Sequence, residues 1–207
     1  MQIRAGFDAK DQRRAAELYW DAFGGKLGRV LGPRTKALAF FERVIRADHA
    51  ISAYTEDGTL LGIAGFKTPK GALADGSFRD MRAVYGLLGA SWRVGLIALL
   101  ERDVENKSFL MDGIFVSDES RGQGVGTQLL DAVRREAERR GYRSVRLDVI
   151  DTNPRAKALY LRNGFVEKGT QELGPLRHIF GFKSAARMVA PVKPEANLAK
   201  SEPSGLE

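Results

Sequence analysis

The chain has 207 residues, of which 43% are hydrophobic and 29% charged, values typical of a globular protein that buries a substantial core. It contains no cysteine, which excludes disulfides, cysteine metal sites and acyl-cysteine chemistry. With only two histidines, His49 and His178, no metal site is expected. The net charge of +7 would suit a nucleic-acid partner. Much of the basic excess, however, lies at 134–143, late in one predicted helix, where the helix dipole stabilises positive charge. Nucleic acid is therefore the least favoured partner.

No segment indicates export or a membrane span. The first residues, MQIRAGF, lack the apolar core of a signal peptide. The most apolar segment, 85–100, contains Arg93 and is too short to cross a bilayer. We therefore expect a cytoplasmic protein without a membrane partner.

The first half of the chain predicts a strand, two helices, a hairpin and a helical insertion. Residues 1–7 form the strand, and apolar residues at helical spacing predict helices at 8–23 and 35–47, separated by a glycine-rich break. Two strands, 49–55 and 60–68, follow, joined by a turn at Gly58. Residues 69–108 form the insertion, with one or two amphipathic helices between 76 and 104 that break near Gly89.

The second half alternates strands and helices until the last two strands. In chain order they are a strand at 109–117, a helix at 124–140 capped by Gly141, a strand at 144–150, a short helix that begins at Asn153-Pro154 and ends at Asn163-Gly164, and strands at 165–171 and 186–192. The order predicts a mixed α/β fold with one sheet, in a single domain at 1–192. The polar tail, 193–207, is expected to be disordered.

Three alternating glycines, Gly122, Gly124 and Gly126, lie between the strand at 109–117 and the following helix. A strand that ends in such a turn and continues as a helix exposes several backbone N–H groups, which bind anions at the positive end of the helix dipole. We expect a phosphate or pyrophosphate ligand that approaches the main chain itself. The alternative is that the glycines only form a tight turn.

The common phosphate motifs do not match this loop. The Walker pattern requires lysine and a hydroxyl residue after the last glycine, but Thr127-Gln128 follow Gly126. The dinucleotide fingerprint G-x-G-x-x-G would need glycine at position 127. Neither a P-loop nor a dinucleotide-binding loop is therefore expected.

Two motifs resemble the GNAT superfamily of acetyl-CoA-dependent N-acetyltransferases. The run RGQGVG at 121–126 is similar to the family's R/Q-x-x-G-x-G/A pyrophosphate loop. The run NPRAKALYLRNGF at 153–165 is similar to its N-x-x-A-x-x-x-Y-x-x-x-G-F block. The order of predicted elements resembles the family's mostly antiparallel central sheet flanked by helices. The resemblance covers about 1–68 and 109–192.

The resemblance implies acetyl-CoA as the acyl donor. It implies that the backbone of Phe115 and Val116 pairs with the pantetheine arm, and that the Val116 N–H holds the acetyl oxygen. It further assigns a set of residues to coenzyme binding: Arg121, Gly122, Gln123, Gly124, Val125, Gly126, Thr127, Asn153, Ala156 and Tyr160. Valine at Gly124 or Gly126 should block the phosphates sterically.

The catalytic assignments follow from the same resemblance. Tyr160 takes the family's role of general acid toward the coenzyme sulfur, with a core tyrosine as the alternative. Asp148, on the face of its strand opposite Val145, Leu147 and Val149, is the first candidate for the general base, and Asp112 is its competitor. Either carboxylate could instead bind the amine or form a structural ion pair. Without cysteine, direct transfer in a ternary complex is expected.

The acceptor site is expected between residues 20–36 and the insertion, as in the family. Aromatic residues are available there: Trp20, Phe23, Phe78, Tyr85 and Trp92. The set is typical of packing or of a homodimer surface, with an acceptor lid as the alternative. The sequence thus favours transfer of an acetyl group to a small amine or a peptide N-terminus. A catalytically silent acyl-CoA-binding module and a basic nucleic-acid-binding protein stay open as alternatives.

Overall fold

The computed structural model describes residues 1–98 and 108–193. Their strands form one seven-stranded sheet in the order β1-β2-β3-β4-β5-β7-β6, in which only β4 and β5 pair in parallel. The strands are β1 Gln2–Ala5, β2 Ala50–Tyr54, β3 Leu60–Lys67, β4 Phe109–Val116, β5 Ser144–Ile150, β6 Val166–Glu172 and β7 Ser184–Pro191. The predicted fold class, a mixed and mostly antiparallel sheet, is confirmed.

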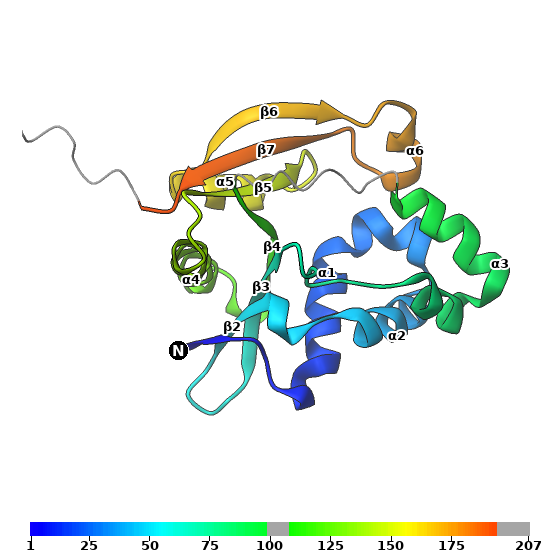
Figure 1. Cartoon of the computed structure of the whole chain (residues 1–207), viewed down its shortest axis with the longest axis horizontal. Helices are drawn as coiled ribbons and strands as arrows, with labels where there is room; N and C mark the ends of the chain where they lie inside the picture. The colour runs from blue at the N-terminus through cyan, green and yellow to red at the C-terminus, as the bar shows by residue number, and fades with distance from the viewer. Residues whose placement is uncertain (99–107, 194–207) are drawn as a thin grey trace, which may run out of the picture.

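Helices cover both faces of this sheet (Figure 1). Helices α1, α2 and α3 lie with α6 on one face, and α4 lies with α5 on the other. Their bounds are α1 Gln12–Leu31, α2 Arg34–Val44, α3 Phe78–Ala98, α4 Val125–Arg139, α5 Pro154–Arg162 and α6 Arg177–Phe180. The insertion between β3 and β4, which contains α3, is therefore confirmed.

Side-chain alternation along the strands divides the interior into two cores. The first core lies under α1, α2 and α3, and the second lies under α4. Val145, Leu147 and Val149 of β5 pack in the second core, whereas Arg146 and Asp148 face the other side of the sheet. Helix α4 buries the predicted apolar stripe: Val125, Leu129, Leu130, Val133 and Ala137.

The local signals for turns and caps are confirmed. Gly58 and Gly141 have φ values of +85° and +81°, a left-handed conformation that glycine adopts without a Cβ penalty. The Asn153 Oδ1 accepts a hydrogen bond of 3.1 Å from the Ala156 N–H and so caps α5.

The predicted glycine-rich break after residue 23 is wrong, because α1 continues to Leu31. Leu27, Val30 and Leu31 are buried in the first core, and this tertiary packing outweighs the low helix propensity of the intervening glycines. Gly24 has a packing role, since a Cβ there would lie 2.9 Å from the Trp20 ring. The second helix ends at Val44, three residues before the predicted end.

The insertion helix bends at a different glycine from the one predicted. Gly86, with φ +73°, interrupts α3, whereas Gly89 lies within its helical part. The predicted helical residues 99–104 and the tail from 194 lie outside the described residues. Across the described ranges, no helix combines the length and the apolar composition that crossing a membrane requires.

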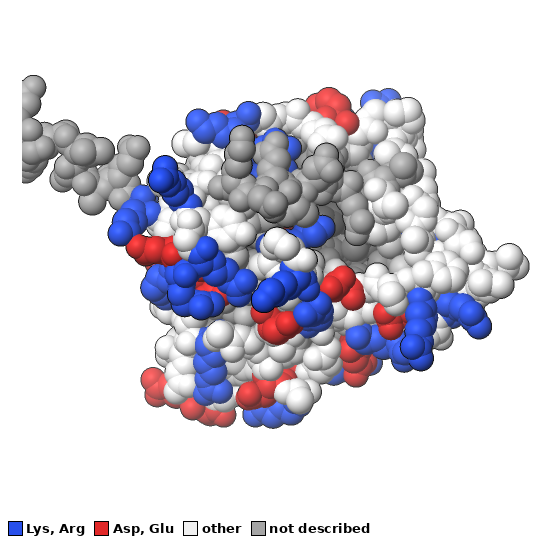
Figure 2. All heavy atoms as spheres, viewed as in Figure 1, with Lys and Arg blue, Asp and Glu red and all other residues white. Residues whose placement is uncertain are grey.

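The basic run at 134–143 lies on a solvated helix face, where acidic side chains accompany the arginines. Figure 2 shows basic and acidic side chains interleaved on this face of the molecule. Glu136 of α4 forms ion pairs with Arg139 at 2.7 Å and Arg140 at 2.6 Å. These pairs explain much of the charge density as helix-surface electrostatics.

Candidate active site

Strands β4 and β5 diverge soon after they begin to pair. Their parallel ladder holds two residue pairs, Phe109 with Val145 and Leu110 with Arg146, although β4 continues to Val116. Beyond these pairs β4 stays with β3, and β5 stays with β7. The divergence leaves an opening within the sheet, toward the C-terminal ends of two parallel strands.

The β4 backbone presents two N–H groups to this opening. The Ser117 N–H donates a 2.9 Å hydrogen bond to the Leu61 carbonyl, toward β3. Because N–H groups alternate in direction along a strand, those of Val116 and Ile114 point away from β3. The Ile114 N–H donates to the Tyr160 hydroxyl, in agreement with this orientation.

The resemblance assigned the backbone of Phe115 to the pantetheine arm, but this backbone points toward β3 and away from the opening. It lies between two opening-facing residues and pairs with Ile63 of β3. Its side chain is buried in the first core, 5.1 Å from the Tyr19 ring centroid and 5.2 Å from that of Phe23. The residue therefore supports the aromatic side of the site, and Ile114 replaces it at the open edge.

Asp112 lies at an irregularity in β4. Gly113 pairs with Gly65 and Met111 with Phe66, so β4 has one residue more than β3 between these pairs. Such a bulge changes the direction of a side chain. The Asp112 Oδ2 accepts a 3.3 Å hydrogen bond from the Leu73 N–H of the insertion.

The glycine loop has the geometry of an anion site. Gly122 and Gly124 have φ values of +80° and +81°, and a Cβ at either would meet nothing within 4 Å. Gly124 is the N-cap of α4 and supplies no capping side chain. The first-turn N–H groups, from Val125 to Thr127, have no acceptor among the described residues. They are therefore available to a ligand at the positive helix end.

Gly126 has a different role from the other two glycines. It lies within α4, and a Cβ there would come within 3.0 Å of Leu159 on α5. Valine at this position would disturb the α4–α5 contact, so Gly124 gives the cleaner test of the expected steric block.

The polar side chains of the loop are engaged near its start. Arg121 forms an ion pair with Asp118, and its side chain is 46% exposed. The Gln123 Nε2 donates a 2.8 Å hydrogen bond to the Glu119 carbonyl. Both side chains lie at the surface, where rearrangement toward a bound anion costs little.

Tyr160 projects from α5 toward the opening. Its side chain is buried in the second core, with its ring 5.6 Å from that of Phe165. Burial raises the pKa of Tyr160 above its usual range, and the hydrogen bond from Ile114 lowers it by less. The phenol is therefore neutral at physiological pH. Since its oxygen accepts from Ile114, its hydrogen can be donated elsewhere.

Both predicted carboxylates line one cavity on the α1 side of the sheet. This cavity has a volume of about 480 Å³ and lies where β4 and β5 diverge, since Leu110, Asp112, Arg146 and Asp148 all line it. The Asp148 carboxylate lies 3.5 Å from the Arg146 guanidinium and 3.9 Å from that of Arg187. The structure thus brings Asp112 and Asp148 together on one face, with Tyr160 approaching from the other.

The aromatic residues expected around the acceptor divide into three groups. Phe23 lines the cavity. Trp20 and Tyr85 are buried in the first core, where the Tyr85 hydroxyl donates to the Leu31 carbonyl. Phe78 and Trp92 are 43% and 46% exposed.

Sequence reasoning missed several residues of the cavity. Tyr19, Phe40 and Phe41 form much of its aromatic wall, and Lys67 and Arg146 lie at its polar end. Strand alternation was a usable signal for Arg146, which has the same orientation as Asp148. The two phenylalanines gave no such signal, because a helical stripe does not distinguish a cavity wall from a packed core.

Comparisons with known proteins agree with this geometry. Residues 13–165 match the family model described as the acetyltransferase (GNAT) family. An N-acetyltransferase from Staphylococcus aureus Mu50 superimposes with a TM-score of 0.63 at 16% identity, over 92% of this chain and 100% of that one. A crystal structure described as an acetyltransferase gives 0.61 at 20% identity, over 93% and 100%. No curated protein sequence matches the chain.

The structure thus has a sheet that opens between two parallel strands, beside a helix start whose first N–H groups have no acceptor among the described residues. The chain belongs to the GNAT acetyltransferase family, and it is an acyltransferase. Members of this family use acetyl-CoA and act on amines. A ribosomal-protein-alanine N-acetyltransferase from Brucella melitensis has the same fold, with a TM-score of 0.55 at 20% identity over 92% of this chain and 99% of that one.

Proposed function

We propose that this protein transfers the acetyl group of acetyl-CoA to a primary amine by direct attack in a ternary complex. The observation that carries the proposal is the divergence of β4 and β5 after Leu110 and Arg146. It leaves an open strand edge between the uncapped start of α4 and a cavity lined by two carboxylates. Residues 1–192 would act as one catalytic domain.

The described residues fit the acyl donor. The N–H groups from Gly122 to Thr127 would bind the pyrophosphate, with Arg121 and Gln123 at its rim. The pantetheine amides would pair with the carbonyl groups of Ile114 and Val116 on the open edge of β4, because the Ile114 N–H donates to Tyr160. Asn153 and Ala156, which form the start of α5, would contact the same arm. Acetyl-CoA supplies a thioester whose carbonyl an amine can attack.

The Val116 N–H would hold the acetyl oxygen and stabilise the negative charge that develops there. A backbone donor of this kind contributes about 3–4 kcal/mol to a transition state of acyl transfer. Among substitutions, only proline removes such a donor.

Tyr160 would protonate the departing thiolate. Its raised pKa keeps the phenol protonated at neutral pH, and at the open edge of β4 it would lie beside the arm. A hydroxyl whose oxygen already accepts a hydrogen bond from Ile114 is oriented to donate its own proton.

Asp148, with Asp112 as the competing candidate, would accept the proton of the attacking ammonium. Both face the cavity from neighbouring strands. The two arginines beside Asp148 compete with an ammonium for its carboxylate. Asp112 has the advantage of the bulge position, next to the point of divergence.

The test is a thiol-release assay with acetyl-CoA and a panel of amines, with the acetylated product identified by mass spectrometry. Initial rates at varied concentrations of both substrates should give intersecting double-reciprocal lines, as a ternary complex requires. Parallel lines together with a trapped acetyl-enzyme would contradict direct transfer. Acetyl-CoA binding without acetylation of any amine would indicate the silent acyl-CoA-binding alternative.

A further inference from the structure

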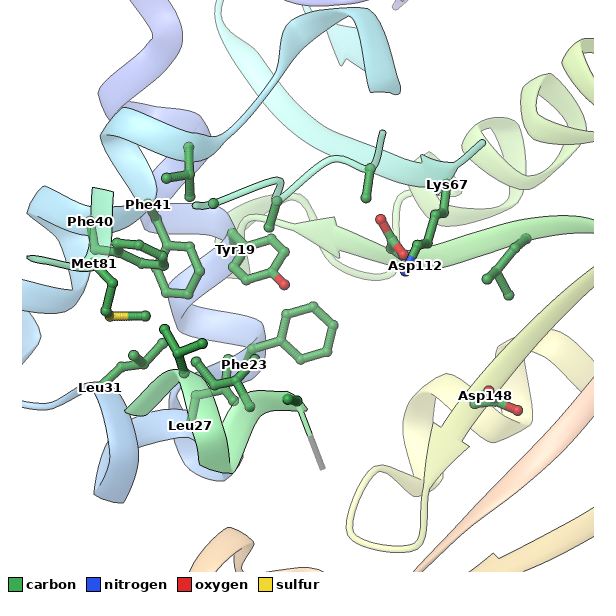
Figure 3. A pocket seen from close by; sticks show the side chains of 18 of the residues that line it. Tyr19, Phe23, Leu27, Leu31, Phe40, Phe41, Lys67, Met81, Asp112 and Asp148 are labelled. Atoms are coloured by element: carbon green, nitrogen blue, oxygen red, sulfur yellow. The ribbon is translucent and has the colours of Figure 1, made fainter. Parts of the chain in front are cut away.

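The cavity beside the open strand edge has an apolar end and a polar end (Figure 3). Side chains from α1, α2 and α3 form the apolar end, which includes Tyr19, Phe23, Leu27, Phe40, Phe41 and Met81. Lys67 and Asp112 lie beside each other at the other end, and Asp148 lies apart from them on β5, across the divergence of β4 and β5. A ligand that fills the cavity must therefore be amphipathic along its length.

The apolar end is a connected aromatic wall. The Tyr19 ring centroid lies 4.7 Å from that of Phe23 and 4.6 Å from that of Phe41. Phe40 extends the wall, 5.4 Å from Phe41. Aromatic pairs at these distances are mutually stabilising and rigid, so the wall is formed before a ligand arrives. It offers ring faces and edges to an apolar group and few hydrogen-bonding partners to a polyhydroxylated one.

The polar end has no excess of negative charge. Its two carboxylates, Asp112 and Asp148, are accompanied by the cations Lys67 and Arg146 in the same lining, and Arg187 lies 3.9 Å from Asp148. Sites for polycations collect acidic residues in excess, because each ligand charge needs a partner when water is removed. This lining lacks such an excess, so it suits an acceptor with a single ammonium group better than a polycation.

Tyr19 connects the two ends. Its ring belongs to the aromatic wall, and burial together with the nearby Asp112 carboxylate raises the pKa of its phenol. The phenol is therefore a neutral donor close to the polar end. A ligand with one ammonium head and an apolar body would pass this residue between the two ends.

We propose that the acceptor is a primary monoamine whose amino group lies one or two carbons from an aromatic or branched apolar group. This inference rests on the proposed acetyltransferase activity and names its substrate class. The chemistry is shared by free arylalkylamines and by peptides with a large apolar first residue. The size of the cavity, about 480 Å³, suits a small molecule or one residue of a peptide.

The experiment compares kcat/KM at saturating acetyl-CoA for 2-phenylethylamine, 3-methylbutylamine, ethanolamine, spermidine and kanamycin. We expect the two apolar amines to exceed ethanolamine by about 100-fold or more, because several methylene equivalents become buried. Hexapeptides that begin with phenylalanine or serine identify the source. If the phenylalanine peptide is preferred over both free amines, the proposed acceptor class holds and its natural source is a protein N-terminus.

A charged substitution tests the wall itself. Ile97 lines the cavity, whereas its neighbour Leu96 is partly buried without lining it. Ile97→Asp should lower kcat/KM for 2-phenylethylamine by about tenfold or more, while Leu96→Asp changes it by less than about threefold. Acetyl-CoA affinity, measured for both variants by calorimetry, reports whether the fold is intact. Equal losses in the two variants, with acetyl-CoA affinity intact, would overturn the assignment of the wall.

The outcomes separate this inference from the proposed activity. If the protein fails to bind acetyl-CoA, the proposed activity fails. If acetyl-CoA binds and spermidine or kanamycin is the preferred acceptor, only the acceptor class fails. If neither 2-phenylethylamine nor the phenylalanine hexapeptide shows calorimetric binding to the protein saturated with coenzyme A, the acceptor class is likewise refuted.

Discussion

Gly124→Ala should weaken acetyl-CoA binding more than its effect on stability explains. Gly124 has φ +81° at the start of α4, with open space where a Cβ would project. An alanine in this left-handed conformation costs about 1–2 kcal/mol, which corresponds to about 2–8 °C in Tm for a chain of this size. Its methyl group would also occupy the space through which a phosphate reaches the N–H groups.

The affinity loss can be worked from those N–H groups. Each hydrogen bond to a charged group contributes about 1.5–3 kcal/mol, so loss of one raises the Kd of acetyl-CoA by about 10- to 100-fold. Calorimetry on folded protein measures this directly, and thermal unfolding measures the strain separately.

Gly141→Ala is the matched control. Gly141 also has φ +81° and open space at its Cβ position, but it lies beyond the other end of α4. It should lose similar stability and keep its affinity for acetyl-CoA. If Gly124→Ala and Gly141→Ala bind acetyl-CoA equally well, the loop is not the pyrophosphate site.

Three further predictions concern proton transfer. Tyr160→Phe should lower turnover by about 100-fold or more, while its acetyl-CoA affinity stays within about threefold of that of the unsubstituted protein. Unchanged turnover, under conditions where chemistry limits the rate, would show that Tyr160 is not the general acid. Asparagine at the general base, either Asp112→Asn or Asp148→Asn, should lower turnover by about 100-fold and abolish the acidic limb of the pH–rate profile. Full activity in both variants would exclude a carboxylate base. Burial raises the pKa of Tyr160, and that of Tyr85 to about 12, so the unfolded chain loses these protons first and the unfolding free energy should fall as pH rises above about 10. Urea midpoints at pH 9 and 11 test this, and a midpoint that stays constant contradicts it.

The parts of the fold that local chemistry determines were predictable from the sequence. Gly58, Gly141 and Asn153 act at turns and helix ends as expected, because those positions need a left-handed residue or a capping side chain. The strand β5 matches its predicted bounds, since alternation between Val145 and Val149 leaves one face apolar.

The parts that tertiary packing determines were not predictable in this way. Helix α1 runs through Gly24 and Gly28 because burial of Leu27 and Leu31 outweighs helix propensity. The position of the α3 bend depends on which of several glycines takes the left-handed conformation, and Gly86 does so.

The candidate site divides in the same way. Its loop and its α5 block follow from contiguous residues, whereas the cavity combines Tyr19, Phe41 and Asp112 from distant segments. The orientation of Phe115 toward β3 depends on the strand register, which one sequence does not specify.

A crystal structure with acetyl-CoA bound tests the central claim most directly. We predict pyrophosphate oxygens within hydrogen-bonding distance of the N–H groups between Gly122 and Thr127, and the thioester in the opening between β4 and β5, beside Tyr160 and the cavity. A coenzyme seated elsewhere, with that opening closed or filled by the protein's own side chains, would contradict the account.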